Sequence, residues 1–416
     1  MKKALVFILT MLVVVGVAFS VTTLNLAMWG SPDEEAVYKK IIAAFEEANP
    51  GIKVQVSVQP WGAYWQQLQT KIVAGSAPDV FAVNGGWLQV FASKGVLFDI
   101  TDLIYGDPAS KNLIESELFP EAVNTFKYQG KLYGLPRDFN TYVVFYNKTM
   151  FDEAGVPYPA LDWTWEDFLD IAKKLTKDVD GDGRIDQWGV IIPINPDYWM
   201  PFIWQNGGEI LNADKTKSLF DSPQNVETFQ FLADLILKYH VSPTISQQAA
   251  FGWNPFGSGK IGMYITGKWM VPTYSTIQNF DWDVQVLPRG KKMAAIANAV
   301  GFSVFKKTKH PKEAVELLKF IATEGQKYLL ELGSSVPTSK SAAFSSEFMD
   351  PTKKPDNKFA FLIEIPYSHI LPFHPKWNEL WDVWSKYPEL IFSGKLSPEY
   401  GVKKMHMEME KILNSK

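Results

Sequence analysis

The sequence contains no cysteine and only five histidines among its 416 residues. Without cysteine the chain can form no disulfide, use no thiol nucleophile and carry no lipid on a cysteine, so its stability must come from packing. The histidines form no His-Glu-x-x-His pattern, and the sequence has neither a Walker loop nor a Gly-x-Ser-x-Gly turn. Thiol catalysis is therefore excluded, and metal-dependent hydrolysis has little support.

Strong charge, internal repeats and low-complexity linkers are also missing. The formal net charge is −4, from 41 Lys and Arg against 45 Asp and Glu, so the chain lacks the basic excess typical of nucleic-acid binding. What it has is length, 46% hydrophobic residues and 15 tryptophans. A chain this long usually exceeds one hydrophobic core, which predicts two lobes. Tryptophan side chains are often buried in the core, but clusters of them near polar groups can also stack on the apolar faces of sugar rings.

The first twenty residues, 1–20, have the pattern of a secretory signal peptide. Two lysines precede an apolar run, Ala4–Val17, and the small-x-small triplet Ala18–Ser20 follows as a cleavage site. The apolar run is too short for a convincing membrane span, although an uncleaved anchor is the alternative. We expect a soluble periplasmic or otherwise extracytoplasmic protein that is not lipid-anchored, because no cysteine is available.

The following stretch predicts a parallel sheet. A strand over 24–30 precedes a helix that Ser31 caps and Glu34 closes as a capping box. Alternating valines at 54–58, a helix over 64–73 and a strand over 79–83 complete a β-α-β-α-β order. This order predicts a parallel sheet with right-handed crossovers, and we expect each lobe of the α/β fold to be a mostly parallel sheet flanked by helices.

Ligands of such sheets bind beyond the carboxyl ends of the strands. These ends carry Trp29, Trp61 and the segment Asn84–Trp87. Three tryptophans at equivalent positions predict a shared aromatic rim, and the glycines beside two of them would let a ligand approach the backbone. The alternative is that these tryptophans only cover the core.

Three segments are predicted to cross between the lobes: 137–140, 288–290 and 334–337. The first is polar and lies between two predicted strands. The second follows a predicted strand over 282–287, and the third follows a predicted helix that begins at 310–311. The predicted division is an N-terminal lobe of 21–138 and 288–335, and a C-terminal lobe of 139–287 and 336–416. Lobes that exchange segments in this way leave no single linker in the sequence.

The segment Asp178–Gly189 (DVDGDGRIDQWG) resembles a calcium-binding loop. Asp178, Asp180, Asp182 and Asp186 match positions 1, 3, 5 and 9 of an EF-hand-type loop. Position 12, normally a bidentate glutamate, is Gly189. A structural Ca²⁺ is therefore one prediction, and a tight Asp/Gly turn without metal is the alternative. No other cofactor is expected.

Two functional classes fit a secreted chain rich in tryptophan. A glycoside hydrolase needs two carboxylates about 5–10 Å apart, and Asp138 with Glu209 or Glu364 are the candidates. A sugar-binding protein uses the same carboxylate differently, because an ionised aspartate accepts hydrogen bonds from hydroxyls while tryptophan covers the ring.

Several segments resemble the bacterial extracellular solute-binding protein family 1, the sugar-binding subunits of ABC importers, of which maltose-binding proteins are examples. The resemblance covers nearly the whole chain after the signal segment. It is carried by Ala74–Phe81, Gly95–Ile104, Tyr128–Pro159, Asp178–Gly189, Phe256–Trp269, His310–Ala322 and Val336–Ala343.

The resemblance implies two lobes that close over a solute, a membrane permease and ATPase as partners, and no catalysis. We expect a monomer that binds a sugar or short oligosaccharide and no nucleic acid. A sugar acid, polyol or glycerol phosphate is the alternative solute, with Arg137 as its anion partner, although Arg137 more simply pairs with a nearby aspartate. The implied contact residues are Trp29, Trp61, Asn84, Trp87, Asp138, Asn140, Trp199, Trp269 and Trp377.

Overall fold

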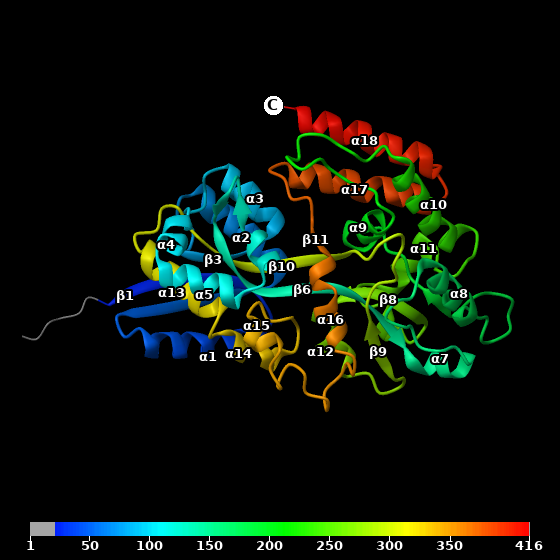
Figure 1. Cartoon of the computed structure of the whole chain (residues 1–416), viewed down its shortest axis with the longest axis horizontal. Helices are drawn as coiled ribbons and strands as arrows, with labels where there is room; N and C mark the ends of the chain where they lie inside the picture. The colour runs from blue at the N-terminus through cyan, green and yellow to red at the C-terminus, as the bar shows by residue number, and fades with distance from the viewer. Residues whose placement is uncertain (1–20, 416) are drawn as a thin grey trace, which may run out of the picture.

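The computed structural model describes residues 21–415, so the predicted signal peptide lies outside the described residues. Two lobes lie side by side, with strands β6 (Gly134–Asn147) and β10 (Ala295–Val304) running between them (Figure 1). The two-lobed α/β fold predicted from the sequence is confirmed.

The first lobe is built on the predicted parallel unit. Strand β1 (Thr22–Trp29) pairs in parallel with β2 (Ile52–Gln59) and β3 (Val80–Asn84). Leu24, Leu26 and Met28 alternate along β1 and are buried, as period two requires for a strand with one core face. Its further elements are α1 (Pro32–Ala48), α2 (Trp61–Val73), α3 (Gly85–Ser93), α4 (Thr101–Tyr105), α5 (Pro108–Glu117), α6 (Pro120–Asn124), β4 (Lys127–Tyr128), β5 (Lys131–Leu132), α13 (Pro311–Ala322) and α14 (Gln326–Leu329).

The second lobe follows a different strand pattern. Strand β8 (Ile261–Gly267) pairs in parallel with β7 (Trp188–Val190), whereas β8 and β9 (Trp282–Gln285) are both antiparallel to β6. Helices α17 (Trp377–Phe392) and α18 (Pro398–Asn414) lie together along its outer side (Figure 1). Its further elements are α7 (Lys148–Ala154), α8 (Trp165–Leu175), α9 (Pro196–Gln205), α10 (Pro223–Leu237), α11 (Ile245–Gln248), α12 (Val271–Tyr274), α16 (Phe359–Ile363) and β11 (Ser368–Ile370).

Strand β6 belongs to both lobes. Its residues Gly134–Thr141 pair with β10, and Tyr142–Asn147 pair with β8 and β9. The polar segment 137–140 was expected as a hinge between two strands, but it continues one strand without a break. The reason is that two later segments hold it extended: β10 pairs with Asp138 and Asn140, and Val336 exchanges both backbone hydrogen bonds with Phe139.

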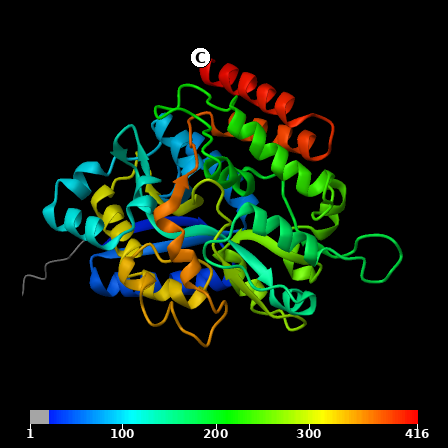
Figure 2. The same ribbon diagram turned by 45° about the vertical axis from the view of Figure 1, so that its right-hand side comes forward.

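The other crossings occur later than the sequence predicted. Backbone contacts join Arg289 to Trp163 and Lys292 to Gln205, so Pro288–Gly290 still packs on the second lobe, and β10 makes the return. Helix α15 (Lys340–Ala343) packs on the first lobe, because Ser339 and Ser341 both donate to the Glu117 carboxylate. The chain has joined the second lobe by Asn357, whose backbone N–H donates to the Asp283 carboxylate. In Figure 2 the orange segment that contains α16 runs in front of the middle of the molecule.

Within residues 21–415, no helix has both the length and the apolarity to cross a membrane.

Candidate functional site

A cavity with a volume of about 720 Å³ lies between the two lobes. This is within the range of about 300–1,000 Å³ typical of small-molecule sites. The loops after β1, β2 and β3 contribute to it, as the rule for parallel strands predicts. Six of the predicted contact residues line this cavity: Trp29, Trp61, Asn84, Asp138, Asn140 and Trp269.

Three predicted contact residues lie elsewhere. Trp199 has no exposed surface, and its indole N–H donates to the Ile194 carbonyl, so we remove it from the candidate site. Trp87 does not line the cavity; it stacks on Trp65, with ring centroids 5.1 Å apart. Trp377 packs against Phe373 and Trp381 outside the cavity lining.

The glycines at the start of α3 have a different role from the one the sequence suggested. A Cβ on Gly85 would lie 2.0 Å from the Phe373 ring, and one on Gly86 would lie 2.5 Å from Trp377 Nε1. The space beside these two glycines is therefore filled by the side chains of Phe373 and Trp377, and a ligand cannot approach the backbone there. Asn84 caps the helix, because its Oδ1 accepts a hydrogen bond from the Trp87 N–H.

The floor of the cavity is formed by the two crossing strands. Asp138, Asn140 and Tyr142 alternate along β6, so their side chains share one face of the strand. On β10, Asn298 lies opposite Asn140, and Val300 lies opposite Asp138. The register slips just after Val300, at a β-bulge.

An ion-pair network supports one end of this floor. Arg137 Nε lies 3.0 Å from Asp138 Oδ2, and Arg137 Nη2 lies 3.7 Å from Glu34 Oε1. The guanidinium also lies 5.3 Å from the centre of the Trp29 ring. Burial raises the pKa of Asp138, and Arg137 opposes that rise. The expected pairing of Arg137 with a neighbouring aspartate is confirmed.

The two sides of the cavity differ in charge. The charged wall comprises Trp29, Asp33, Glu34 and Trp61, together with Arg137 and Asp138 where the floor meets this wall. The uncharged wall comprises Trp269, Pro272 and Thr273, together with Tyr142 where the floor meets that wall. Every charged residue among the described lining residues belongs to the charged wall.

Tyr142 and Trp269 form an aromatic pair on the uncharged wall, with centroids 5.1 Å apart in an edge-to-face arrangement. The Tyr142 hydroxyl donates to Asp197 Oδ2 at 2.9 Å. Burial raises the pKa of Asp197 to about 6. Trp61 and Trp269 are 53% and 37% exposed, so each has ring surface that a solute could cover.

The sequence reasoning missed several lining residues. Tyr142 and Asn298 could have been found from the period-two faces of their strands, once Asp138 and Asn140 were chosen. Glu34 was interpreted only through the helix cap, which is indeed present, and Asp33 was given no role. Ser334 and Ser335 lie in a predicted crossing segment, and nothing in their residue type indicated a cavity.

The carboxylate pair required by a glycoside hydrolase is not formed as proposed. Neither Glu209 nor Glu364 lines the cavity with Asp138. Glu364 is 1% exposed, and its carboxylate accepts a hydrogen bond from the Leu287 N–H. Burial raises the pKa of Glu364 to about 8.

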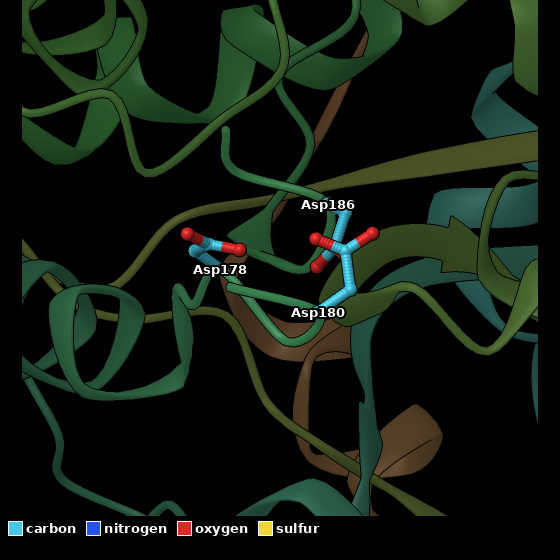
Figure 3. Close-up of side chains that lie close together, drawn as sticks. All are labelled: Asp178, Asp180 and Asp186. Carbon is cyan, nitrogen blue, oxygen red and sulfur yellow. The ribbon is translucent and has the colours of Figure 1, made fainter. Parts of the chain in front are cut away.

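The acidic loop between α8 and β7 brings three of its four aspartates together. Carboxylate oxygens of Asp178, Asp180 and Asp186 lie within 4.8 Å of one another (Figure 3). Asp182 is outside this group, and its Oδ1 accepts a hydrogen bond from the Arg184 N–H. At position 12 a Cβ on Gly189 would lie 2.0 Å from the Ala172 carbonyl oxygen, so a glutamate has no room there. The oxygen donors fit a hard cation, but the bidentate ligand is missing.

Two lobes with a polar and aromatic cavity between them define the class of two-lobed solute-binding proteins. The sequence profile described as "Bacterial extracellular solute-binding protein" matches residues 29–328. The chain belongs to this family, which confirms the resemblance found in the sequence.

Several relatives extend this similarity. A galactooligosaccharide-binding protein of Bacillus subtilis is 25% identical over 388 residues, covering 90% of this chain and 86% of the relative. A maltotriose-binding protein of Pyrococcus abyssi is 24% identical, covering 84% and 73%. Among solved structures, an ABC substrate-binding protein from Listeria monocytogenes in complex with cycloalternan is 30% identical, with a TM-score of 0.82 and coverage of 95% and 100%.

Proposed function

We propose that this protein captures a sugar or short oligosaccharide in the cavity between its lobes and delivers it to the permease of an ABC importer. The observation that carries the proposal is the cavity itself. Exposed tryptophans stand on both of its walls, and amide and carboxylate groups form its floor. Sugars present apolar ring faces and hydroxyl edges, which these two kinds of group complement. The relatives named for oligosaccharides support the same solute class.

The proposed mechanism is closure of the two lobes over the solute. Contacts to both walls stabilise the closed form by the difference between the binding free energies of the solute in the closed and open forms. The crossing strands join the walls and supply the floor, so a solute on the floor contacts groups whose position changes little. The permease would then recognise the closed form.

We propose a binding role without catalysis. Family members are binding proteins, and the carboxylate pair considered for hydrolysis does not share the cavity. The proposed setting is extracytoplasmic, with the signal segment removed, and the proposed state is a monomer.

We also propose that the acidic loop holds a structural Ca²⁺ through Asp178, Asp180 and Asp186. When bound, the ion would neutralise three clustered carboxylates and brace the loop. The cavity residues do not include this loop, so solute binding would not require the ion.

The test of the main proposal is a thermal-shift screen of the chain from Val21 onward, against neutral oligosaccharides, sugar acids, amino sugars and polyols. A solute that binds the native state raises the melting temperature by mass action. Recovery of the glycan intact distinguishes a binding protein from a hydrolase. Cleavage of the glycan, or no shift with any carbohydrate, would contradict the proposal.

A further inference from the structure

Among the lining residues, four buried side-chain atoms have no hydrogen-bond partner within the described residues: three are acceptors, and one, Arg137 Nη1, is a donor. Asp138 Oδ1, Asn140 Oδ1 and Asn298 Oδ1 are buried and have no hydrogen-bond partner within the described residues. All three residues line the cavity, on the facing strands β6 and β10. A buried acceptor without a partner costs about 1–3 kcal/mol, so a solute that donates hydrogen bonds here removes that cost.

The cavity as a whole carries negative charge. Its charged lining residues are three carboxylates, Asp33, Glu34 and Asp138, and one guanidinium, Arg137, a formal charge of −2. Charges of one sign that line a cleft with low-dielectric walls concentrate their electrostatic field in the cleft, which here repels an anion. The charge alone therefore disfavours an anion.

The single cation is the least accessible of these charges. The Arg137 side chain is 6% exposed, against 14% for Asp138 and 27% for Glu34. Its guanidinium is held between those two carboxylates and lies over the Trp29 ring. An incoming anion would meet the carboxylates first and would have to displace them to reach the guanidinium. Its Nη1 has no hydrogen-bond partner within the described residues but is itself buried, so it presents no open anion site. Arg137 thus positions Asp138 and is not a receptor for an anion.

We propose that the cleft selects solutes that present hydrogen-bond donors to its floor, namely neutral sugars or sugars bearing an ammonium group, and that it excludes sugar acids and sugar or glycerol phosphates. This inference rests on the proposed function and narrows its solute class. It decides against the anionic alternatives that Arg137 suggested in the sequence.

Matched glycans that differ only in charge test the selection. The chain from Val21 onward is titrated with α-1,4 and β-1,4 glucose trimers, with the corresponding glucosamine and glucuronic acid trimers, and with glycerol 3-phosphate, and the melting temperature is followed. We expect a shift from a neutral or amino trimer and none from its acidic counterpart or from glycerol 3-phosphate. A shift from an acidic trimer or from glycerol 3-phosphate at least as large as that of the neutral trimer overturns the inference while leaving a carbohydrate-binding function standing. No shift from any of these probes or from any carbohydrate of the wider screen contradicts both.

A substitution in the cavity floor gives a second test, which measures affinity and does not depend on the charge of the glycan. Asn298→Leu removes one acceptor at similar size, and we expect it to weaken binding of the neutral or amino trimer about 5–10-fold, the effect of losing one hydrogen bond of about 1 kcal/mol. Asn279→Leu is the matched control, because Asn279 is exposed and outside the cavity lining. Unchanged affinity in Asn298→Leu, with the fold retained, would show that the floor acceptors do not select the solute.

Discussion

The two walls of the cavity show two ways of building a binding surface. On the charged wall, Arg137 and Asp138 are nearly enclosed and are tied to Glu34 and the Trp29 ring. On the uncharged wall, Trp269 is 37% exposed and its neighbour Tyr142 carries one hydrogen bond, to Asp197. The Arg137–Asp138 pair of the charged wall is therefore part of the folded core, whereas Trp61 on that wall and Trp269 on the uncharged wall keep ring surface that no described residue covers.

Because of this difference, we expect substitutions in the enclosed ion pair to change folding stability and substitutions of the exposed rings to change solute affinity. A change to the enclosed ion pair should act first on folding, since a buried charge left alone is costly. A change to the exposed aromatic should act on solute affinity and leave folding almost untouched. The predictions below test that separation, from the largest expected effect to the smallest.

Arg137→Met should give the largest effect, a loss of stability of about 3–5 kcal/mol, because it leaves Asp138 buried with no cation. Urea unfolding followed by circular dichroism measures it. Lys131→Met is the control, since the Lys131–Asp99 pair is exposed and its removal should change stability little. Equal losses in the two variants would contradict the assignment of the Arg137–Asp138 pair to the core.

Trp269→Ala should weaken solute binding by roughly 2 kcal/mol, about 30-fold, with no comparable loss of stability. Isothermal titration with the glycan that gives the largest thermal shift measures the affinity. The control is Trp253→Ala, because Trp253 is more exposed but lies outside the cavity lining. If the two variants bound equally well, the uncharged wall would not be a solute contact.

Asp197→Asn should alter the pH dependence of stability. Its folded pKa of about 6 lies above the ordinary value of 3.8, so between these values the folded state keeps a proton that the unfolded state has lost. The contribution of Asp197 is thus present below about pH 4 and lost as pH rises through 6. The variant should gain stability over the wild type across that window, reaching roughly 3 kcal/mol at pH 7. Urea unfolding at pH 4, 5, 6 and 7 measures it, and a difference that does not grow with pH would contradict the burial of this carboxyl.

Calcium should have the smallest effect on the cavity. Added Ca²⁺ should raise the melting temperature of the wild type, and removing it with a chelator should reverse the rise without changing solute affinity. The control is Asp178→Asn combined with Asp180→Asn, which should abolish the response. A loss of solute binding on chelation would show that the loop and the cavity are coupled.

The first lobe was predictable because local signals agree there. The capping box of Ser31 and Glu34, the alternating strands and the β-α-β-α-β order all indicate one parallel sheet, and the carboxyl-end rule then places Trp29 and Trp61 at the cavity. These relations depend on short stretches of sequence, so one chain is enough to find them.

The crossings and part of the site were not predictable in the same way. Whether segment 137–140 is a hinge or a strand depends on β10, which lies more than 150 residues later in the chain. Trp199 and Trp269 are both tryptophans near glycine and aromatic residues, yet one is fully buried and the other exposed. Which of the two tryptophans is buried depends on how distant elements pack against it, and the local sequence does not show that packing.

The most direct test of the account is a crystal structure of the chain from Val21 onward with the neutral glycan that gives the largest thermal shift. The account predicts an intact glycan between the two walls, with a ring face against Trp269 or Trp61 and hydroxyls donating to Asp138, Asn140 and Asn298. A glycan bound outside the cavity, or one whose carboxylate or phosphate contacts Arg137, would contradict it.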